Sequence, residues 1–227
     1  MKTKILFSLF ILIVTSQSVY SQLALGVNGG ITSSNMSVPF DKQKSGIRIG
    51  LSTEYSFTDH FVLMSGLDFV VKGSNNMQND LSYSPEMKIF SVQLGYLQLP
   101  ILLGYKLKMK NEFVITPAIG LYFSYGIWGN AEIDEFNFDA REENKYIEMD
   151  WNPYTSTTLN DWGRTTLSGM DRFDYGLSLG IQAEYSRYYC KLYYDFGLPY
   201  IWDGFGDNIK DVRNRSITVG FGYKFKL

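Results

Sequence analysis

Residues 216–227 read SITVGFGYKFKL, and every second position of this stretch is apolar or aromatic. The apolar and aromatic set is Ile217, Val219, Phe221, Tyr223, Phe225 and Leu227. The residues between them are small or charged. Successive side chains of a β-strand point to opposite faces, whereas a helix would scatter both sets around its circumference. The stretch therefore predicts a strand with one apolar face and one polar face.

The same two-residue period recurs in seven earlier segments. They lie at residues 23–31, 47–57, 61–72, 97–107, 113–126, 173–185 and 188–197. One face of each segment is mostly large and apolar or aromatic, and the other is rich in Gly, Ser, Ala and Thr. Val62, Val70 and Leu102 break the pattern by placing apolar side chains on the polar face. The chain thus predicts eight strands of the length that crosses a bilayer when tilted, about 9–11 residues each.

The connections between these segments alternate strictly in length. Three are tight turns, at 58–60, 108–111 and 186–187, and four are long, at 34–45, 74–93, 129–171 and 198–212. In an up-and-down sheet, this alternation places all long connections at one end and the short turns with both termini at the other. Outer-membrane barrels have this asymmetry, with short periplasmic turns and long extracellular loops. Face parity also predicts Phe57 opposite Phe61 and Tyr185 opposite Tyr188.

Charged residues on the polar face are expected to point into the lumen. The predicted lumen charges are Arg48, Glu54, Asp68, Lys72, Lys106, Glu184, Lys191 and Asp195. The interior of an eight-stranded barrel holds little beyond side chains, and small residues with paired charges suit it. A soluble barrel of lipocalin type would turn its apolar face inward and would need charges over its outside. The sequence therefore favours an all-β fold, an eight-stranded antiparallel up-and-down transmembrane β-barrel, closed because lipid tolerates no open sheet edge.

Composition agrees with one envelope domain. The 227 residues are 16% aromatic, and tyrosines and phenylalanines gather near the predicted strand ends, as rings do at membrane interfaces. Residues 1–21 read as a signal peptide, with Lys2 and Lys4 before a ten-residue apolar run, which leaves 22–227 as the barrel domain. A net charge of −2 argues against a nucleic-acid partner, and one cysteine and one histidine exclude most zinc sites.

Four motifs resemble a known family. They are GVNGG at 26–30, LDFVVKG at 67–73, YLQLPILL at 96–103 and VGFGYKF at 219–225. The sequence is similar to the outer-membrane β-barrel domain proteins, or porin-family barrels, of Bacteroidetes. The resemblance implies location in outer-membrane lipid, insertion by the outer-membrane assembly machinery, and no shared catalytic residues or cofactor. Tyr223, Phe225 and Leu227 look like the C-terminal signal that this machinery recognises. Pro100 belongs to one motif, but the strand position of Pro117 has no explanation in the sequence.

The connection at 129–171 is the most individual segment. It contains ten acidic and three basic residues interleaved with aromatic ones. Trp151, Tyr154 and Trp162 are candidates for contact with an unknown extracellular or envelope partner, because exposed aromatics anchor interfaces. The alternative is a solvated acidic loop that only covers the barrel mouth. No spacing in it matches an EF-hand calcium loop.

Two further functions are weighed against a structural or surface-interaction role. The lumen charges permit a narrow porin-like channel for small solutes, but a satisfied salt-bridge network in a plugged lumen is favoured, because wide pores need more strands. An enzyme is not expected. His60 falls in a predicted turn without a nucleophile or base assigned to it, and Cys190 falls on the apolar face as a small lipid-facing residue.

Overall fold

The computed structural model describes residues 22–37, 42–78, 87–137, 145–159, 165–167, 169–202 and 212–226. The predicted signal peptide at 1–21 lies outside these residues. None of the described segments forms a helix long and apolar enough to cross a membrane.

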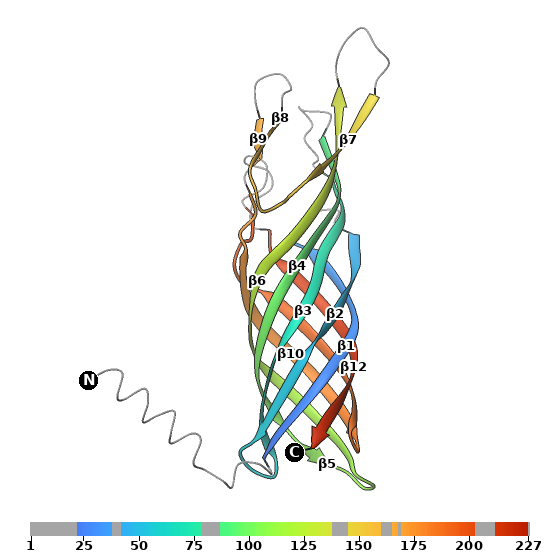
Figure 1. Cartoon of the computed structure of the whole chain (residues 1–227), viewed down its shortest axis with the longest axis vertical. Coiled ribbons are helices and arrows are strands. Elements are labelled where there is room, and N and C mark those ends of the chain that lie inside the picture. The colour runs from blue at the N-terminus through green and yellow to red at the C-terminus, as the bar shows by residue number, and fades with distance from the viewer. Residues whose placement is uncertain are drawn as a thin grey trace, which may run out of the picture.

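Eight long strands of the described chain form a closed antiparallel barrel (Figure 1). They are β1 (Leu23–Met36), β2 (Lys42–Ser56), β3 (Phe61–Gln78), β4 (Met87–Tyr105), β6 (Phe113–Asn137), β10 (Phe173–Tyr185), β11 (Tyr188–Gly197) and β12 (Asn214–Lys226). Each strand pairs with the next one along the chain, and β12 pairs with β1 to close the barrel. The predicted eight-stranded up-and-down barrel is confirmed. We call the end with the short turns the turn end and the opposite end the loop end.

The segment 129–171, which the sequence analysis treats as a loop, contains strands. β6 continues through it to Asn137 and pairs with β7 (Lys145–Trp151) in a hairpin that protrudes above the barrel (Figure 1). β4 pairs with the same stretch of β6 as far as Glu135. The sequence did not reveal this extension, because a strand above the membrane needs no apolar face. The apolar alternation therefore stops among the acidic residues, although the backbone hydrogen bonds continue. Three short strands complete the set: β5 (Leu107–Lys108), β8 (Thr157–Leu159) and β9 (Thr165–Leu167).

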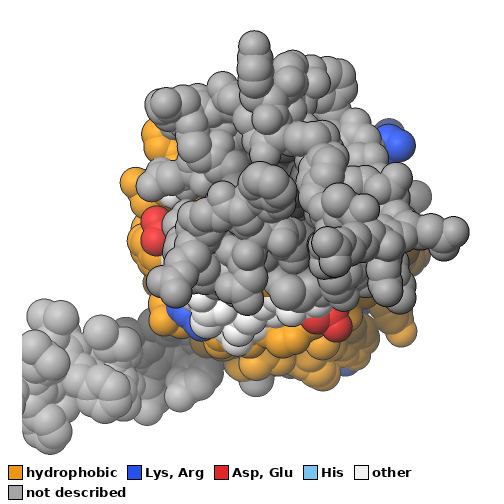
Figure 2. Space-filling view, turned by 90° about the horizontal axis from the view of Figure 1, so that it is seen from above, with side chains coloured by type: hydrophobic (Ala, Val, Ile, Leu, Met, Phe, Trp, Pro, Cys, Tyr) orange, Lys and Arg blue, Asp and Glu red, His pale blue; other side chains and the backbone are white. Residues whose placement is uncertain are grey.

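The two faces of the barrel wall have opposite chemistry. Large apolar side chains are exposed along every barrel strand, as Ile31, Leu51 and Leu179 illustrate at 67%, 61% and 59%. Figure 2 shows these hydrophobic side chains around the outer wall where it is visible from above. The small and charged residues of the same strands are buried inside. The inward polar face and the outward apolar face are therefore as predicted. An apolar outer wall of this kind is typical of a barrel that is surrounded by lipid.

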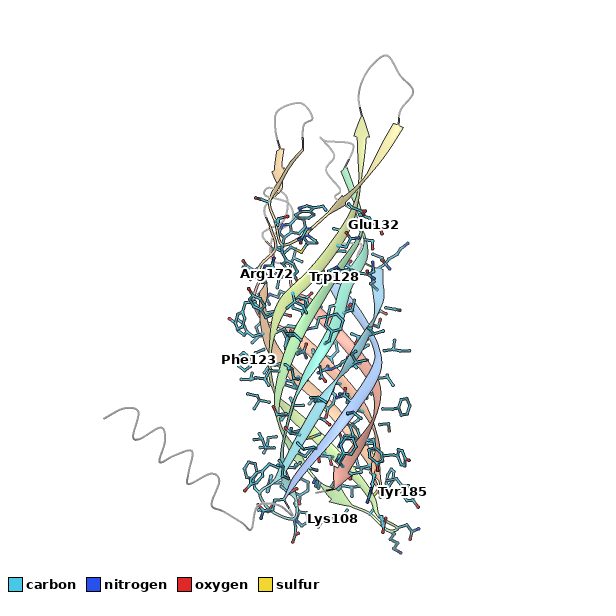
Figure 3. All side chains as sticks on the ribbon, in the orientation of Figure 1. Lys108, Phe123, Trp128, Glu132, Arg172 and Tyr185 are labelled. Atoms are coloured by element: carbon cyan, nitrogen blue, oxygen red, sulfur yellow. The ribbon has the colours of Figure 1, made fainter. Side chains whose placement is uncertain are left out.

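The predicted registers are also confirmed at the turn end. Tyr185 pairs with Tyr188 across the turn of Ser186 and Arg187, and the Phe57 amide donates to the Phe61 carbonyl at 3.0 Å. Ser186 has φ 58°, the left-handed conformation that a two-residue hairpin turn demands. Aromatic rings collect at this end, where Tyr188 and Tyr223 lie edge to face at 5.4 Å. Lys108 and Tyr185 lie at the turn end, while Trp128 and Arg172 lie near the loop end (Figure 3).

Both prolines inside strands lie beside interruptions of the hydrogen-bonded ladder. The β3–β4 pairing skips the residues between Ser65–Ile101 and Asp68–Gln98, the gap that contains Pro100. The Ser65 hydroxyl donates to the Pro100 carbonyl at 2.8 Å and bridges this gap. Pro117 pairs with Ile181 on one side, and on the other it faces the break between β4 and β5. Each proline is therefore placed where a missing backbone donor costs little.

Gly222 on β12 lies under the inward-pointing ring of Tyr189, its cross-strand partner on β11. A Cβ at position 222 would overlap that ring, and no other atoms lie among its three nearest contacts. We expect Gly222→Ala to lower the free energy of unfolding by about 1–3 kcal/mol, because the lumen cannot accept the displaced ring. Urea unfolding in lipid vesicles measures this loss. Combination with Tyr189→Leu should recover part of it, and strictly additive losses would contradict the proposed clash.

Candidate functional site

The predicted lumen charges converge inside the barrel. Six of the eight are almost completely buried, with exposed fractions between 1% and 8%; they are Arg48, Glu54, Asp68, Lys72, Lys191 and Asp195. Lys106 and Glu184 lie at the turn end and keep 20% and 17% of their side chains exposed. The alternation of the strands therefore brings residues from β2, β3, β10 and β11 into one interior site, together with Lys106 from the junction between β4 and β5.

Arg48 is the centre of the middle layer of this site. Its Nε donates to Asp68 Oδ2 at 2.8 Å, and its Nη2 lies 2.7 Å from the same oxygen. Its Nη1 reaches Asp195 Oδ2 at 3.3 Å. One guanidinium thus joins carboxylates from β3 and β11, which face each other across the lumen. Charge-assisted bonds of this kind are roughly twice as strong as neutral ones, and the side chains that form these are almost completely buried.

Neutral side chains complete the bonding of both aspartates. Asp195 accepts hydrogen bonds from Gln98 Nε2 at 2.9 Å and from Ser178 Oγ at 2.6 Å. Asp68 accepts from Asn28 Nδ2 at 3.1 Å, and Asn28 Oδ1 in turn accepts from Lys191 Nζ at 2.8 Å. Both aspartates are therefore paired with a cation and hydrogen-bonded at once, which is what burial of an ion requires. Lys191 instead bonds the neutral Asn28, and none of the ion pairs among the described residues includes it.

A second layer lies nearer the loop end. Lys72 Nζ is 3.5 Å from Asp174 Oδ2, and neither side chain has any exposed surface. The ammonium also lies 4.4 Å from the ring centre of Tyr122 and 5.4 Å from that of Tyr96. Asn214 Nδ2 donates to Asp174 at 3.1 Å. Two rings, a carboxylate and an amide therefore enclose a single lysine.

A third layer closes the turn end. Lys224 Nζ lies 2.7 Å from Glu54 Oε1 and also bonds Glu184. Glu54 is further bound by Lys106 Nζ at 3.6 Å and accepts from Gln182 Nε2 at 2.8 Å. Ion pairs and hydrogen bonds therefore connect side chains at three successive levels of the lumen.

Sequence reasoning did not place the aromatic members of the lumen. It assigned the aromatic rings to the lipid face, yet Tyr96, Tyr122, Tyr189 and Tyr193 are all buried inside. Their strand parity was the available signal, because each alternates with an exposed neighbour such as Tyr188 or Tyr194. The space left in this part of the lumen is small. A cavity of about 30 Å³ lies beside Arg48, Asn28 and Tyr193, room for about two water molecules.

An apolar cluster covers the loop end of the lumen. It contains Met36, Val92, Leu94, Tyr96, Ala131, Trp151, Met170, Ile201, Trp202 and Val212. Trp151 Nε1 donates to the Thr155 carbonyl at 2.8 Å, and its ring lies 6.4 Å from that of Trp202. The prediction that Trp151 is a surface contact is therefore wrong. It is 4% exposed, because the end of β7 folds this indole inward over the barrel mouth.

Tyr154 is only partly accessible, and the third predicted contact, Trp162, lies outside the described residues. The Tyr154 ring packs edge to face on Tyr96 at 6.5 Å and carries the Arg172 guanidinium at 4.6 Å. Burial in this loop raises the pKa of the Tyr154 hydroxyl to about 12, so it stays protonated at neutral pH. Arg172 also donates to the Gly126 carbonyl at 2.9 Å, and this bond connects the segment before β10 to β6.

The remaining candidates have simple surroundings. His60 lies in the turn between β2 and β3 and stacks on Tyr105 at 5.5 Å. Cys190 is exposed on the outer face, as predicted for a lipid-facing residue. Of the expected assembly signal, Phe225 is 47% exposed, and the ring of Tyr223 packs edge to face on it with the ring centres 5.3 Å apart, while Leu227 lies outside the described residues.

Residues 15–203 match the family model described as the outer membrane protein beta-barrel domain. The chain belongs to this family. This outer-membrane barrel also resembles solved structures at low identity. Neisserial surface protein A is 15% identical, with 88% of this chain and 97% of that chain covered and a TM-score of 0.44. OprG from Pseudomonas aeruginosa is 14% identical, covers 92% and 98%, and has a TM-score of 0.47. Ail of Yersinia pestis is 12% identical, covers 90% and 99%, and has a TM-score of 0.42. No curated protein matches the outer-membrane barrel in sequence.

Proposed function

We propose that this outer-membrane barrel is a non-enzymatic membrane platform that presents its long connections, and above all the β6–β7 hairpin, outside the cell. The loop end then faces the exterior and the turn end the periplasm. The assembly machinery inserts the barrel through its C-terminal strand, after residues 1–21 are removed. A Bacteroidetes source, which the four sequence motifs suggest, is part of the same proposal.

The filled lumen is the observation that carries this proposal. Arg48, Lys72 and Glu54 each belong to one of three layers of paired charges, and the apolar cluster around Trp151 and Trp202 covers the loop end. Eight strands enclose little more than side chains, whereas aqueous porins use about 16–18. A lumen built in this way supports a rigid platform better than a path for solutes.

The protruding sheet supports a surface-interaction role. β4, β6 and β7 continue together past the barrel mouth, and within the described residues β7 pairs only with β6. An edge strand with a free side can add a strand from another chain, a common mode of recognition. Glu132 and Asp150 are exposed on this sheet, so a partner with basic side chains suits it best.

Conductance of the reconstituted barrel tests the proposal directly. We expect planar bilayers that contain the full mature chain to show no stable, size-selective channels. Stable channels that discriminate small solutes would support the narrow porin instead. Replacement of residues 135–165 by a short glycine-serine linker is the second arm. Loss of cell-surface binding with an intact barrel is expected, and unchanged binding would refute the interaction role.

A further inference from the structure

Two arginines lie at the loop end of β12, where its lipid-facing apolar positions end; Arg215 is in the strand, and Arg213 lies directly before the strand begins. Ile217, Val219 and Phe221 are exposed at 43%, 51% and 69%. The next two outward positions toward the loop end are Arg215 and Arg213. At these two positions, positive charges follow the row of exposed apolar side chains that begins at Phe221.

Aromatic rings of the neighbouring strand end support both guanidinium groups. Arg215 pairs with Phe196 on β11, and its guanidinium carbon lies 5.3 Å from the centre of that ring. The Arg213 guanidinium carbon lies 4.4 Å from the centre of the Tyr200 ring, which is 43% exposed. A guanidinium stacked on a ring keeps the hydrogen-bonding edge of its fork available. The rings therefore hold both cations against the barrel wall and leave their outer edges toward the surroundings.

The described part of the protein offers no anion to either arginine. None of its ion pairs includes Arg213 or Arg215, whereas Arg48, Lys72 and Lys224 inside the lumen are all paired. The Nε atoms of both arginines are covered and have no acceptor among these residues. On the adjacent strands, Asn35 lies opposite Arg215, and the Ser33 hydroxyl donates to Gln43 Oε1 at 3.0 Å. None of these polar side chains is an anion.

We propose that Arg213 and Arg215 form a binding site for the phosphate group of an outer-leaflet glycolipid. Planar guanidinium forks match phosphate oxygens in bidentate geometry. The exposed residues next to them toward the middle of the barrel wall, Ile217 and its cross-strand partner Tyr194, lie where the acyl chains of the same lipid would run. This neighbouring apolar wall favours a lipid phosphate over free phosphate. The inference depends on the proposed orientation, in which the loop end lies in the outer leaflet.

Native mass spectrometry of the detergent-solubilised full barrel tests this site with diphosphoryl lipid A as the probe. We expect wild type to retain one lipid molecule tightly and Arg213→Gln/Arg215→Gln to bind it at least about a hundredfold more weakly, about tenfold for each charge-assisted contact removed. Dephosphorylated lipid A should bind wild type no better than the double variant binds the phosphorylated form. Because binding in micelles requires neither orientation nor a surface partner, its failure is separable from failure of the proposed function.

Arg187→Gln is the matched control. Arg187 lies in the β10–β11 turn at the opposite end and contacts the aromatic Tyr223, whose hydroxyl it bonds at 3.1 Å. Its loss should leave lipid retention unchanged. Heat-modifiable gel mobility establishes that each variant is a folded barrel, and Arg213→Lys/Arg215→Lys, which keeps the charge but not the fork, should bind with intermediate affinity. Equal retention by wild type and the glutamine double variant, or displacement by inorganic phosphate at concentrations similar to those of the lipid, would overturn the proposal.

Discussion

Replacement of Arg48 by methionine is expected to lower the free energy of unfolding of the barrel by about 3–5 kcal/mol. Arg48 bonds Asp68 and Asp195 with both sides of its guanidinium, and all three side chains are at most 3% exposed. Methionine keeps the unbranched stem of arginine but leaves two buried carboxylates without their cation. Urea titration of the barrel in lipid vesicles, followed by tryptophan fluorescence and by gel mobility, measures the loss.

A triple variant separates lost charge pairing from lost packing. Arg48→Met with Asp68→Asn and Asp195→Asn removes all three charges, and we expect it to be more stable than Arg48→Met alone. The exposed Arg187 serves as a matched arginine, whose replacement by glutamine should leave the unfolding midpoint unchanged. If Arg48→Met unfolds at the wild-type urea concentration, the central layer contributes nothing to stability and the plugged-lumen interpretation fails.

Leu179→Arg is expected to cost about 2–4 kcal/mol of unfolding free energy in the membrane, the penalty for an arginine on the lipid face at mid-bilayer depth. Leu179 is 59% exposed and lies midway along β10, between Phe173 near the loop end and Tyr185 at the turn end. The side chain makes few internal contacts, so in water its replacement would be nearly neutral. The cost therefore reports on the hydrocarbon around the barrel rather than on the barrel itself.

Tyr185→Arg provides the depth control for Leu179→Arg. Tyr185 is as exposed, at 61%, but it lies in the aromatic girdle at the turn end. We expect a cost of only about 0–1 kcal/mol there, because an arginine near the interface reaches water and headgroups. Unfolding in vesicles of one lipid composition gives both values. Equal costs at the two positions would contradict the assignment of the apolar wall to the membrane.

Arg48→Met and Leu179→Arg test the inner and the outer face of the barrel wall, respectively. Every barrel strand carries apolar side chains outward and polar ones inward, so a slip of one residue between neighbouring strands would bury leucines and expose charges. The Arg48–Asp68–Asp195 bonds join β2, β3 and β11, and so penalise any register in which these residues do not meet. We infer that the buried charges of this barrel help to select a single register.

The sequence alone determined the fold, because a strand period of two leaves little freedom once one face is apolar. The alternation from Leu23 to Phe225 specifies the strands and which face meets lipid, and connection lengths specify their order. The opposition of Tyr185 and Tyr188 follows from parity around a two-residue turn. The same alternation identified eight lumen charges, since a charged residue on the inward face of a strand must point into the barrel.

Tertiary structure decided which of those charges meet and where the mouth is closed. Arg48 and Asp195 are 147 residues apart, and their contact depends on the tilt and closure of the whole barrel, which no local pattern encodes. The inward tyrosines and the buried Trp151 were misassigned for a related reason. An aromatic ring is compatible with lipid, with the lumen and with a water-covered cap alike, so only the strands packed around it determine which surface it fills.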